Sequence, residues 1–146
     1  MDSLISFLGL VNKAGRLSIG EEPVGASCRA KKASLIVLAT DAADNSVRRA
    51  KHFAEAGQCL CLTIPLNKAQ LGQASGRSSC AMAAIDDIGF AAALAKKLVA
   101  ADADSYTEAH ERLFEKAQKS LQRQKEKRAH EKKLARKQKP WAFRSQ

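Results

Sequence analysis

LIVLATDAAD, residues 35–44, is the stretch that decides the fold of this 146-residue chain. Residues 35–39 are apolar and mostly branched, which is typical of a strand buried on both faces of a sheet. Asp41 and Asp44 follow, and they mark the start of a helix because a carboxylate there accepts hydrogen bonds from free N–H groups. A buried strand that leads directly into a helix predicts an α/β protein.

The same alternation extends in both directions from this stretch. Leu4, Leu8 and Val11 repeat at helical spacing, and Gly15 follows as a stop. Strands that alternate with helices at such intervals predict a three-layer α-β-α sandwich around a small mixed sheet. The expected helices cover 3–14, 20–31, 41–57, 67–75 (capped by Asn67) and 88–100 (capped by Asp86 or Asp87), and the expected strands cover 16–19, 35–39, 59–64 (also buried) and 80–85.

Charge divides the chain into two parts. Residues 1–104 hold 12 Lys and Arg against 10 Asp and Glu, whereas residues 105–146 hold 13 against 5. We therefore expect a nearly neutral domain over 1–104 and a basic tail over 105–146. The tail is expected to be a helix that packs or frays near its start and a solvated basic arm beyond, and to end with two exposed aromatics, Trp141 and Phe143. Such an uneven charge points to a polyanionic partner, most often nucleic acid.

From composition and the first residues we expect neither a membrane protein nor an exported one. The longest apolar runs fall far short of the roughly 18 residues that a membrane span needs. No positive charge precedes the short apolar stretch 4–11, so we expect no secretory signal. The four cysteines, Cys28, Cys59, Cys61 and Cys80, are then expected to stay reduced. The expected location is the cytoplasm.

Candidates for catalysis or metal binding are weak. Cys59 and Cys61 are separated by one residue, a shorter gap than zinc knuckles use, and His52 is the nearest histidine. Core packing explains these thiols best, and a metal or redox role is the alternative. Asp86 and Asp87 are explained as helix caps. We therefore expect no enzymatic activity, no cofactor and no metal.

Two segments offer backbone N–H groups to a polyanion. The helix start at Gly20 and the turn 76–79 both project from one end of the predicted sheet. Glu22 and Arg29 are seven residues apart on one helix face, so a carboxylate and a guanidinium are both available to nucleotide edges. The few aromatics before residue 104, Phe53 among them, are assigned to the core, which argues against a base-stacking platform. Cations are expected to flank the start of the Gly20 helix: Lys13, Arg16, Arg29, Lys31 and Lys32.

Four segments together resemble a known family. They are GLVNKAGRL (9–17), GEE (20–22), LIVLATDA (35–42) and LGQASG (71–76). In order and spacing they are similar to bacterial homologues of the L7Ae and L30e ribosomal-protein family, over about residues 3 to 100. The resemblance implies an α-β-α sandwich that binds RNA, typically at kink-turns, as part of ribosomes or other ribonucleoproteins. It also implies that the start of the second helix and the turn before the last strand face the RNA.

One motif departs from that family. Its kink-turn signature runs Gly-x-Asn-Glu-x-x-Lys, and here Gly20 is kept while Glu22, Pro23 and Ala26 replace the other three. The missing lysine removes a phosphate contact, and Glu22 offers acceptors only. RNA binding then depends on the free backbone N–H groups at the Gly20 helix start together with Arg29 and Arg77.

These observations predict a non-enzymatic RNA-binding protein. Its partners are structured RNA, ribosomal RNA among the candidates, and ribosomal proteins, with no membrane. The basic tail adds a salt-sensitive attraction to phosphates that is blind to sequence. A protein-protein interaction adaptor on the same fold is the alternative. The predicted RNA-binding residues are Lys13, Arg16, Gly20, Glu21, Glu22, Arg29, Lys32, Gly76, Arg77 and Ser78.

Overall fold

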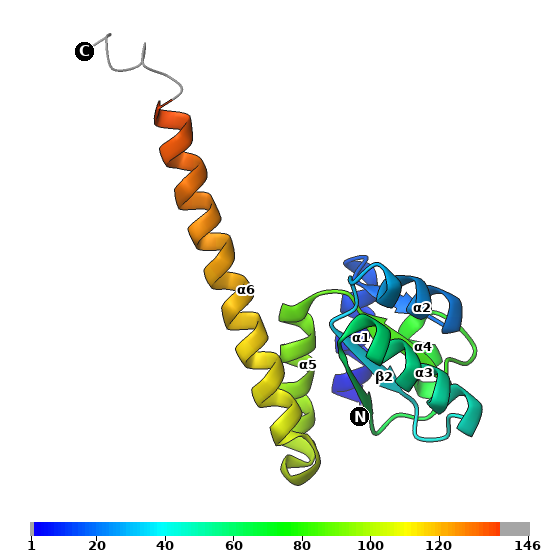
Figure 1. Cartoon of the computed structure of the whole chain (residues 1–146). Coiled ribbons are helices and arrows are strands. Elements are labelled where there is room, and N and C mark those ends of the chain that lie inside the picture. The colour runs from blue at the N-terminus through cyan, green and yellow to red at the C-terminus, as the bar shows by residue number, and fades with distance from the viewer. Residues whose placement is uncertain (1, 138–146) are drawn as a thin grey trace.

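A four-stranded mixed sheet lies between two layers of helices in the computed structural model (Figure 1). The structure describes residues 2–137, so the aromatics expected at Trp141 and Phe143 lie outside the described residues. β4 is antiparallel to both of its neighbours, whereas β2 and β3 are parallel. The strands, in their order across the sheet, are β1 (Leu17–Ile19), β4 (Met82–Ile85), β2 (Leu35–Leu38) and β3 (Leu60–Thr63).

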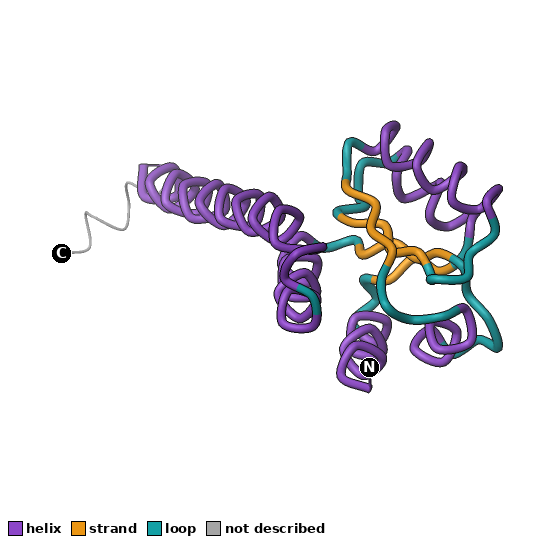
Figure 2. Tube along the Cα trace, turned by 90° about the horizontal axis from the view of Figure 1, so that it is seen from below, coloured by secondary structure: helices purple, strands orange, loops and turns teal. Residues whose placement is uncertain are grey.

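The helices cover both faces of this sheet. α2 and α3 pack on one face, and α1, α4 and α5 pack on the other, while α6 packs against α5 (Figure 2). The predicted three-layer sandwich is confirmed. Within residues 2–137, no helix is both long and apolar enough to cross a membrane. The helices are α1 (Asp2–Lys13), α2 (Glu21–Arg29), α3 (Asp44–Gly57), α4 (Lys68–Ser75), α5 (Ile88–Ala101) and α6 (Ala103–Lys137).

The strand that decides the fold is buried on both faces, as predicted. Leu35 and Val37 point into the core beneath α1 and α5, and Ile36 and Leu38 point into the core beneath α2 and α3. All four side chains are at most 2% exposed. Full burial of such a side chain stabilises the fold by about 1.5–3 kcal/mol.

The prediction that the strand near residues 59–64 is buried is wrong. β3 pairs only with β2 and lies at the edge of the sheet. Leu60, Cys61 and Leu62 are half-buried, and Thr63 is exposed. An apolar run does not distinguish a central strand from an edge strand, because that depends on which strands pair with it.

Side chains fix the starts of two helices where the sequence predicts them. The Asn67 side chain accepts a hydrogen bond from the backbone N–H of Gln70 at 2.8 Å, and the Gln70 side chain accepts one from Asn67 N at 2.9 Å. Asp87 caps α5. Asp41 does not begin α3: its carboxylate accepts a hydrogen bond from Lys68 N at 2.7 Å and so supports α4 instead.

Asp86 has a different role from its neighbour. Its carboxylate accepts hydrogen bonds from the hydroxyls of Ser18, at 2.6 Å, and of the buried Ser27. These bonds join β1 and α2 to the end of β4. Of this pair, Asp87 thus caps α5, whereas Asp86 connects β1, α2 and the end of β4 through hydrogen bonds.

α6 begins as part of the body and continues as an exposed arm. Leu113 is fully buried, and the Tyr106 hydroxyl donates a hydrogen bond to Thr63 O at 2.6 Å. Over 121–135 every described side chain is exposed. Of the two alternatives for the start of the tail, packing is confirmed, and the described part beyond it is solvated. A domain boundary after residue 104 stays a prediction, since the first turns of α6 contribute to the core.

Candidate nucleic-acid interface

Gly20 sets the direction in which α2 leaves the sheet. Its φ of 93° and ψ of 166° lie in a region that essentially only glycine adopts. Its N–H donates to Met82 O at 3.2 Å, and its C=O accepts from Val24 N at 3.0 Å. The first turn of α2 therefore begins at the end of β1, with its positive dipole end toward solvent.

The turn after α4 is held close to that helix by Gly72 and Gly76. Gly76 ends α4 with a φ of 76°, and Arg77 N donates to Gly72 O at 2.8 Å. A Cβ on Gly72 would lie 2.7 Å from Ser79 N and 2.9 Å from Arg77 O. Only glycine at position 72 lets the turn fold back this tightly.

We expect Gly72→Ala to destabilise the protein by about 1–3 kcal/mol, because an added methyl group would push the backbone of the turn away from α4. Chemical denaturation measures the change. Gly9→Ala is the matched control, since its Cβ would meet Ala74 O at an ordinary 3.8 Å. A loss of stability no larger than that of the control would contradict the close approach.

The two segments meet at one end of the sheet, as predicted. Arg77 Nη1 lies 3.9 Å from the position that a Cβ on Gly20 would take. Gly76, Arg77 and Ser78 are all exposed. A guanidinium, a hydroxyl and the start of a helix thus share one surface that faces solvent.

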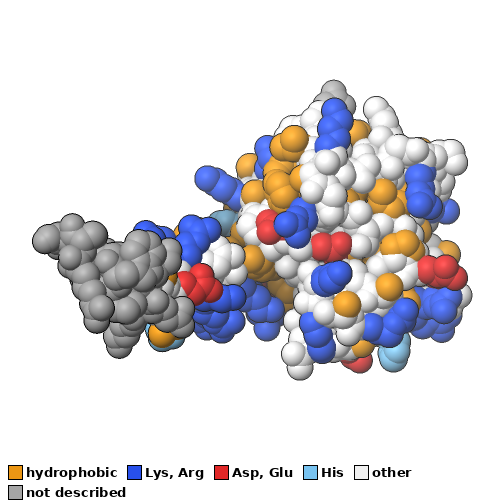
Figure 3. Space-filling view, turned by 90° about the horizontal axis from the view of Figure 1, so that it is seen from above, with side chains coloured by type: hydrophobic (Ala, Val, Ile, Leu, Met, Phe, Trp, Pro, Cys, Tyr) orange, Lys and Arg blue, Asp and Glu red, His pale blue; other side chains and the backbone are white. Residues whose placement is uncertain are grey.

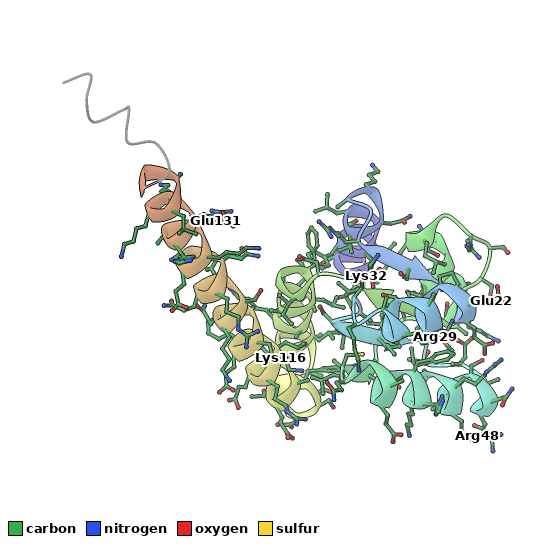
Figure 4. All side chains as sticks on the ribbon, turned by 45° about the horizontal axis from the view of Figure 1, so that its top comes forward. Glu22, Arg29, Lys32, Arg48, Lys116 and Glu131 are labelled. Atoms are coloured by element: carbon green, nitrogen blue, oxygen red, sulfur yellow. The ribbon has the colours of Figure 1, made fainter. Side chains whose placement is uncertain are left out.

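The exposed face of α2 borders a hollow of about 500 Å³. Glu22 and Arg29 both line it, as their spacing predicts, and Figure 4 shows them along α2. Arg49 and Phe53 of α3 form the other side. A Cβ on Gly25 would lie 3.0 Å from the Phe53 ring, so this glycine lets the aromatic ring approach α2.

Sequence reasoning missed the contribution of α3. The sequence predicts Phe53 in the core, but its side chain is only half-buried and borders the hollow. Arg49 pairs with Glu21 at 2.8 Å, which offsets the carboxylate nearest the start of α2. The absence of a side chain at Gly25 is the signal that could have indicated the close approach of α2 and α3.

Four predicted cations do not flank Gly20, and that part of the prediction is wrong. Arg16 lies at the other end of β1, where its C=O accepts from Asp86 N at 2.8 Å. Lys13 precedes the same end of the strand, while Lys31 and Lys32 follow the far end of α2. At about 3.3 Å per residue, β1 separates Arg16 from Gly20 by about 13 Å. Figure 4 shows Lys32 beyond Arg29, on the side of α6.

Burial raises the pKa of all four cysteine thiols and so favours their protonated form. Burial raises the pKa of Cys59 from 9.0 to about 12 and that of Cys61 from 9.0 to about 11. A protonated thiol is a poor nucleophile and a poor metal ligand. Among residues 2–137, no group of three or more His, Cys, Asp or Glu side chains could hold a metal ion.

We expect the free energy of unfolding to fall as the pH rises above about 9. In the unfolded chain Cys59 and Cys61 lose their protons near their ordinary pKa of 9.0, whereas the folded chain keeps them to about 12 and about 11. The unfolded chain then binds fewer protons, so high pH favours it. Urea denaturation at about pH 8 and about pH 10 measures the drop. The variant Cys59→Ala/Cys61→Ala should lose part of this drop; an equal drop in both proteins would contradict the raised pKa values.

Comparisons with known proteins give one family and many solved structures of similar fold. Residues 2–95 match the model of the ribosomal protein L7Ae/L30e/S12e/Gadd45 family. The structure is similar to that of a protein with unknown function from Bacillus halodurans, with 27% identity and a TM-score of 0.58 over 64% of this chain and 93% of that one. It is also similar in fold to the Giardia lamblia 15.5kD RNA binding protein, with 20% identity and a TM-score of 0.53 over 66% and 85% of the two chains. No curated protein matches the chain.

Proposed function

This chain belongs to the ribosomal protein L7Ae/L30e/S12e/Gadd45 family, and from that premise we propose that it is a non-enzymatic RNA-binding protein of the ribosome or another ribonucleoprotein. The similar fold from Giardia lamblia is that of an RNA binding protein, which supports the proposal. Four free thiols support a cytoplasmic location, since disulfides form mostly in exported proteins. The observation that carries the proposal is the meeting of Arg77 with Gly20 at one end of the sheet.

The chemistry of that end suits an RNA phosphate. The guanidinium of Arg77 can donate two parallel hydrogen bonds to phosphate oxygens. The Ser78 hydroxyl and the first N–H groups of α2 add donors that position a backbone without reading sequence. The ion pair of Glu21 with Arg49 reduces the negative charge that would otherwise repel the ligand.

The side chains along α2 suit unpaired bases in a structured RNA. Glu22 is exposed and can only accept, so it pairs with the amino groups of bases rather than with carbonyl edges. Arg29 on the same face donates to acceptors of the base or the backbone. We propose a looped or bent RNA, with ribosomal RNA as the first candidate, bound in a manner like kink-turn binding but without the contact that the family lysine makes at the position of Ala26.

Arg29→Gln/Arg77→Gln is the variant that tests this site. We expect its affinity for a structured ribosomal RNA fragment to be about 10-fold to 100-fold weaker at about 50 mM salt, because two guanidinium contacts are lost. Fluorescence anisotropy over a series of salt concentrations measures it. Lys96→Gln/Lys97→Gln removes the same charge from α5, on the other face of the sheet, and is expected to change the affinity little.

An equal loss of RNA affinity in both variants would show that only the net charge of the protein matters, and would contradict binding at this site. A complex with a cellular protein that survives nuclease treatment, together with no affinity for RNA, would favour the adaptor function instead. The outcomes therefore separate the two functions on one set of purified proteins.

A further inference from the structure

A second groove lies between α6 and the end of the sheet opposite Gly20. It has a volume of about 660 Å³ and is lined by the chain that follows α2, by the end of α3 and the chain after it, by Ile88 at the start of α5, and by the middle of α6. It is therefore built from four segments that are far apart in the sequence. It exists because α6 docks beside the body.

The groove is basic. Lys31 lines one side, and Lys116, Lys119 and Arg123 line the other. None of its lining residues, all of which belong to the described part of the chain, is acidic. Ser34 and Ser120 add hydroxyl groups. Figure 3 shows Lys and Arg side chains on both sides of the junction between α6 and the body.

The core of the protein fixes which face α6 turns to the groove. Leu113 is fully buried, and Ala117 packs against the same core. Lys116 and Ser120 stand three and seven residues after Leu113, so the helical repeat places them on the face that α6 turns to the body. On the opposite side, Lys31 Nζ donates a hydrogen bond to Ala56 O at 2.5 Å. Like charges are thus held facing one another across an open groove, and an anion between them relieves their repulsion.

α2 connects this groove with the first site. Its nine residues span about 13 Å at about 1.5 Å per residue. Lys31, Ala33 and Ser34 follow α2 directly and line the groove, and in the view of Figure 4 Arg29 and Lys32 lie between Glu22 and Lys116. A chain with regularly spaced phosphates that leaves the Gly20 end along α2 therefore arrives at the groove.

We propose that the groove is a second RNA-binding site, which holds the phosphodiester backbone of the same RNA that contacts Gly20 and Arg77. The inference rests on the proposed function and adds a path to it: RNA enters at one end of the sheet, follows α2 and lies between the body and α6. α6 then acts as one wall of a binding site as well as a basic arm.

Protection of lysines from acetylation tests this path directly. The full chain is treated with a lysine-acetylating reagent with and without a structured ribosomal RNA fragment, and mass spectrometry gives the extent of modification at each lysine. We expect Lys31, Lys116 and Lys119 to be protected several-fold by the RNA, while Lys96 and Lys97 on α5 react equally in both. Inorganic phosphate at the same phosphate concentration is expected to protect far less, because it lacks the linked charges of a polymer.

The variant Lys116→Gln/Lys119→Gln/Arg123→Gln gives an independent measurement. Glutamine keeps the helix propensity of these positions, and circular dichroism checks that α6 is intact. We expect binding at least about 10-fold weaker at about 50 mM salt and a salt dependence flatter by about 2–3 units of slope. Lys51→Gln/Lys96→Gln/Lys97→Gln removes the same charge outside the groove and serves as the control.

Failure of this inference is distinguishable from failure of the proposed function. RNA that binds the full chain but leaves Lys31, Lys116 and Lys119 unprotected overturns the groove and leaves the Gly20 site standing. Equal protection by RNA and by inorganic phosphate overturns the polymer path in favour of a small-anion site. A chain that binds no RNA at all overturns both.

Discussion

A chain shortened to end at Gln124 is expected to bind structured RNA at least about 100-fold more weakly than the full chain at about 50 mM salt. Residues 125–146 hold nine Lys and Arg against two Asp and Glu. Each phosphate that such cations neutralise contributes about 0.7–0.9 to the slope of log affinity against log salt. Removing them should therefore flatten the slope by several units as well as weaken binding.

The position of the cut matters. Ending the chain near residue 104 would also remove Leu113 from the core and destroy the groove beside α6. Ending it at Gln124 keeps both, because the described side chains over 125–135 are exposed. The shortened chain should unfold at the same urea concentration as the full chain, and the two affinities should converge at high salt. Equal slopes for the two proteins would contradict the role given to the arm.

Leu113→Ala is expected to destabilise the protein by about 2–5 kcal/mol. Leu113 is 0% exposed and is the largest fully buried side chain among the described residues of α6, where it joins the core shared by α1, α4 and α5. Truncation removes apolar contacts and leaves a cavity that the neighbouring helices can fill only in part. Urea denaturation measures the loss of free energy of unfolding.

Leu121→Ala is the matched control for this substitution. It removes the same atoms from the same helix two turns later, where the side chain is 48% exposed, and should change the stability by less than about 1 kcal/mol. If the two variants were equally stable, α6 would not be docked through Leu113. The groove beside α6 would then lose the contact that fixes which face α6 turns to it.

The layers of this fold could be predicted because local signals agreed with the final packing. The apolar run 35–39 is buried on both faces, and Asn67 and Asp87 cap the helices that they precede. The burial of β3 could not be predicted, because an edge strand and a central strand of similar composition differ only in their neighbours.

The candidate site could be predicted only in part, for a related reason. The sequence predicts that Gly20 and Arg77 lie at one end of the sheet, because both flank strands there, and the structure confirms that they are close. Lys13 and Arg16 precede β1, and Lys31 and Lys32 follow α2, so all four lie away from Gly20, which stands between these two elements. The lengths of the strand and of the helix separate them from Gly20, whichever way the strand runs. The groove beside α6 forms only because α6 packs against α5 and the rest of the body. In the sequence alone, the cations of α6 can be recognised only as charges of a basic tail.

Equilibrium binding of the full chain to structured ribosomal RNA tests the account most directly. The account predicts saturable binding in dilute buffer, at about 50 mM salt, and an affinity that falls linearly with salt on logarithmic axes. Binding that is absent even in dilute buffer, or that is indifferent to salt, would contradict it.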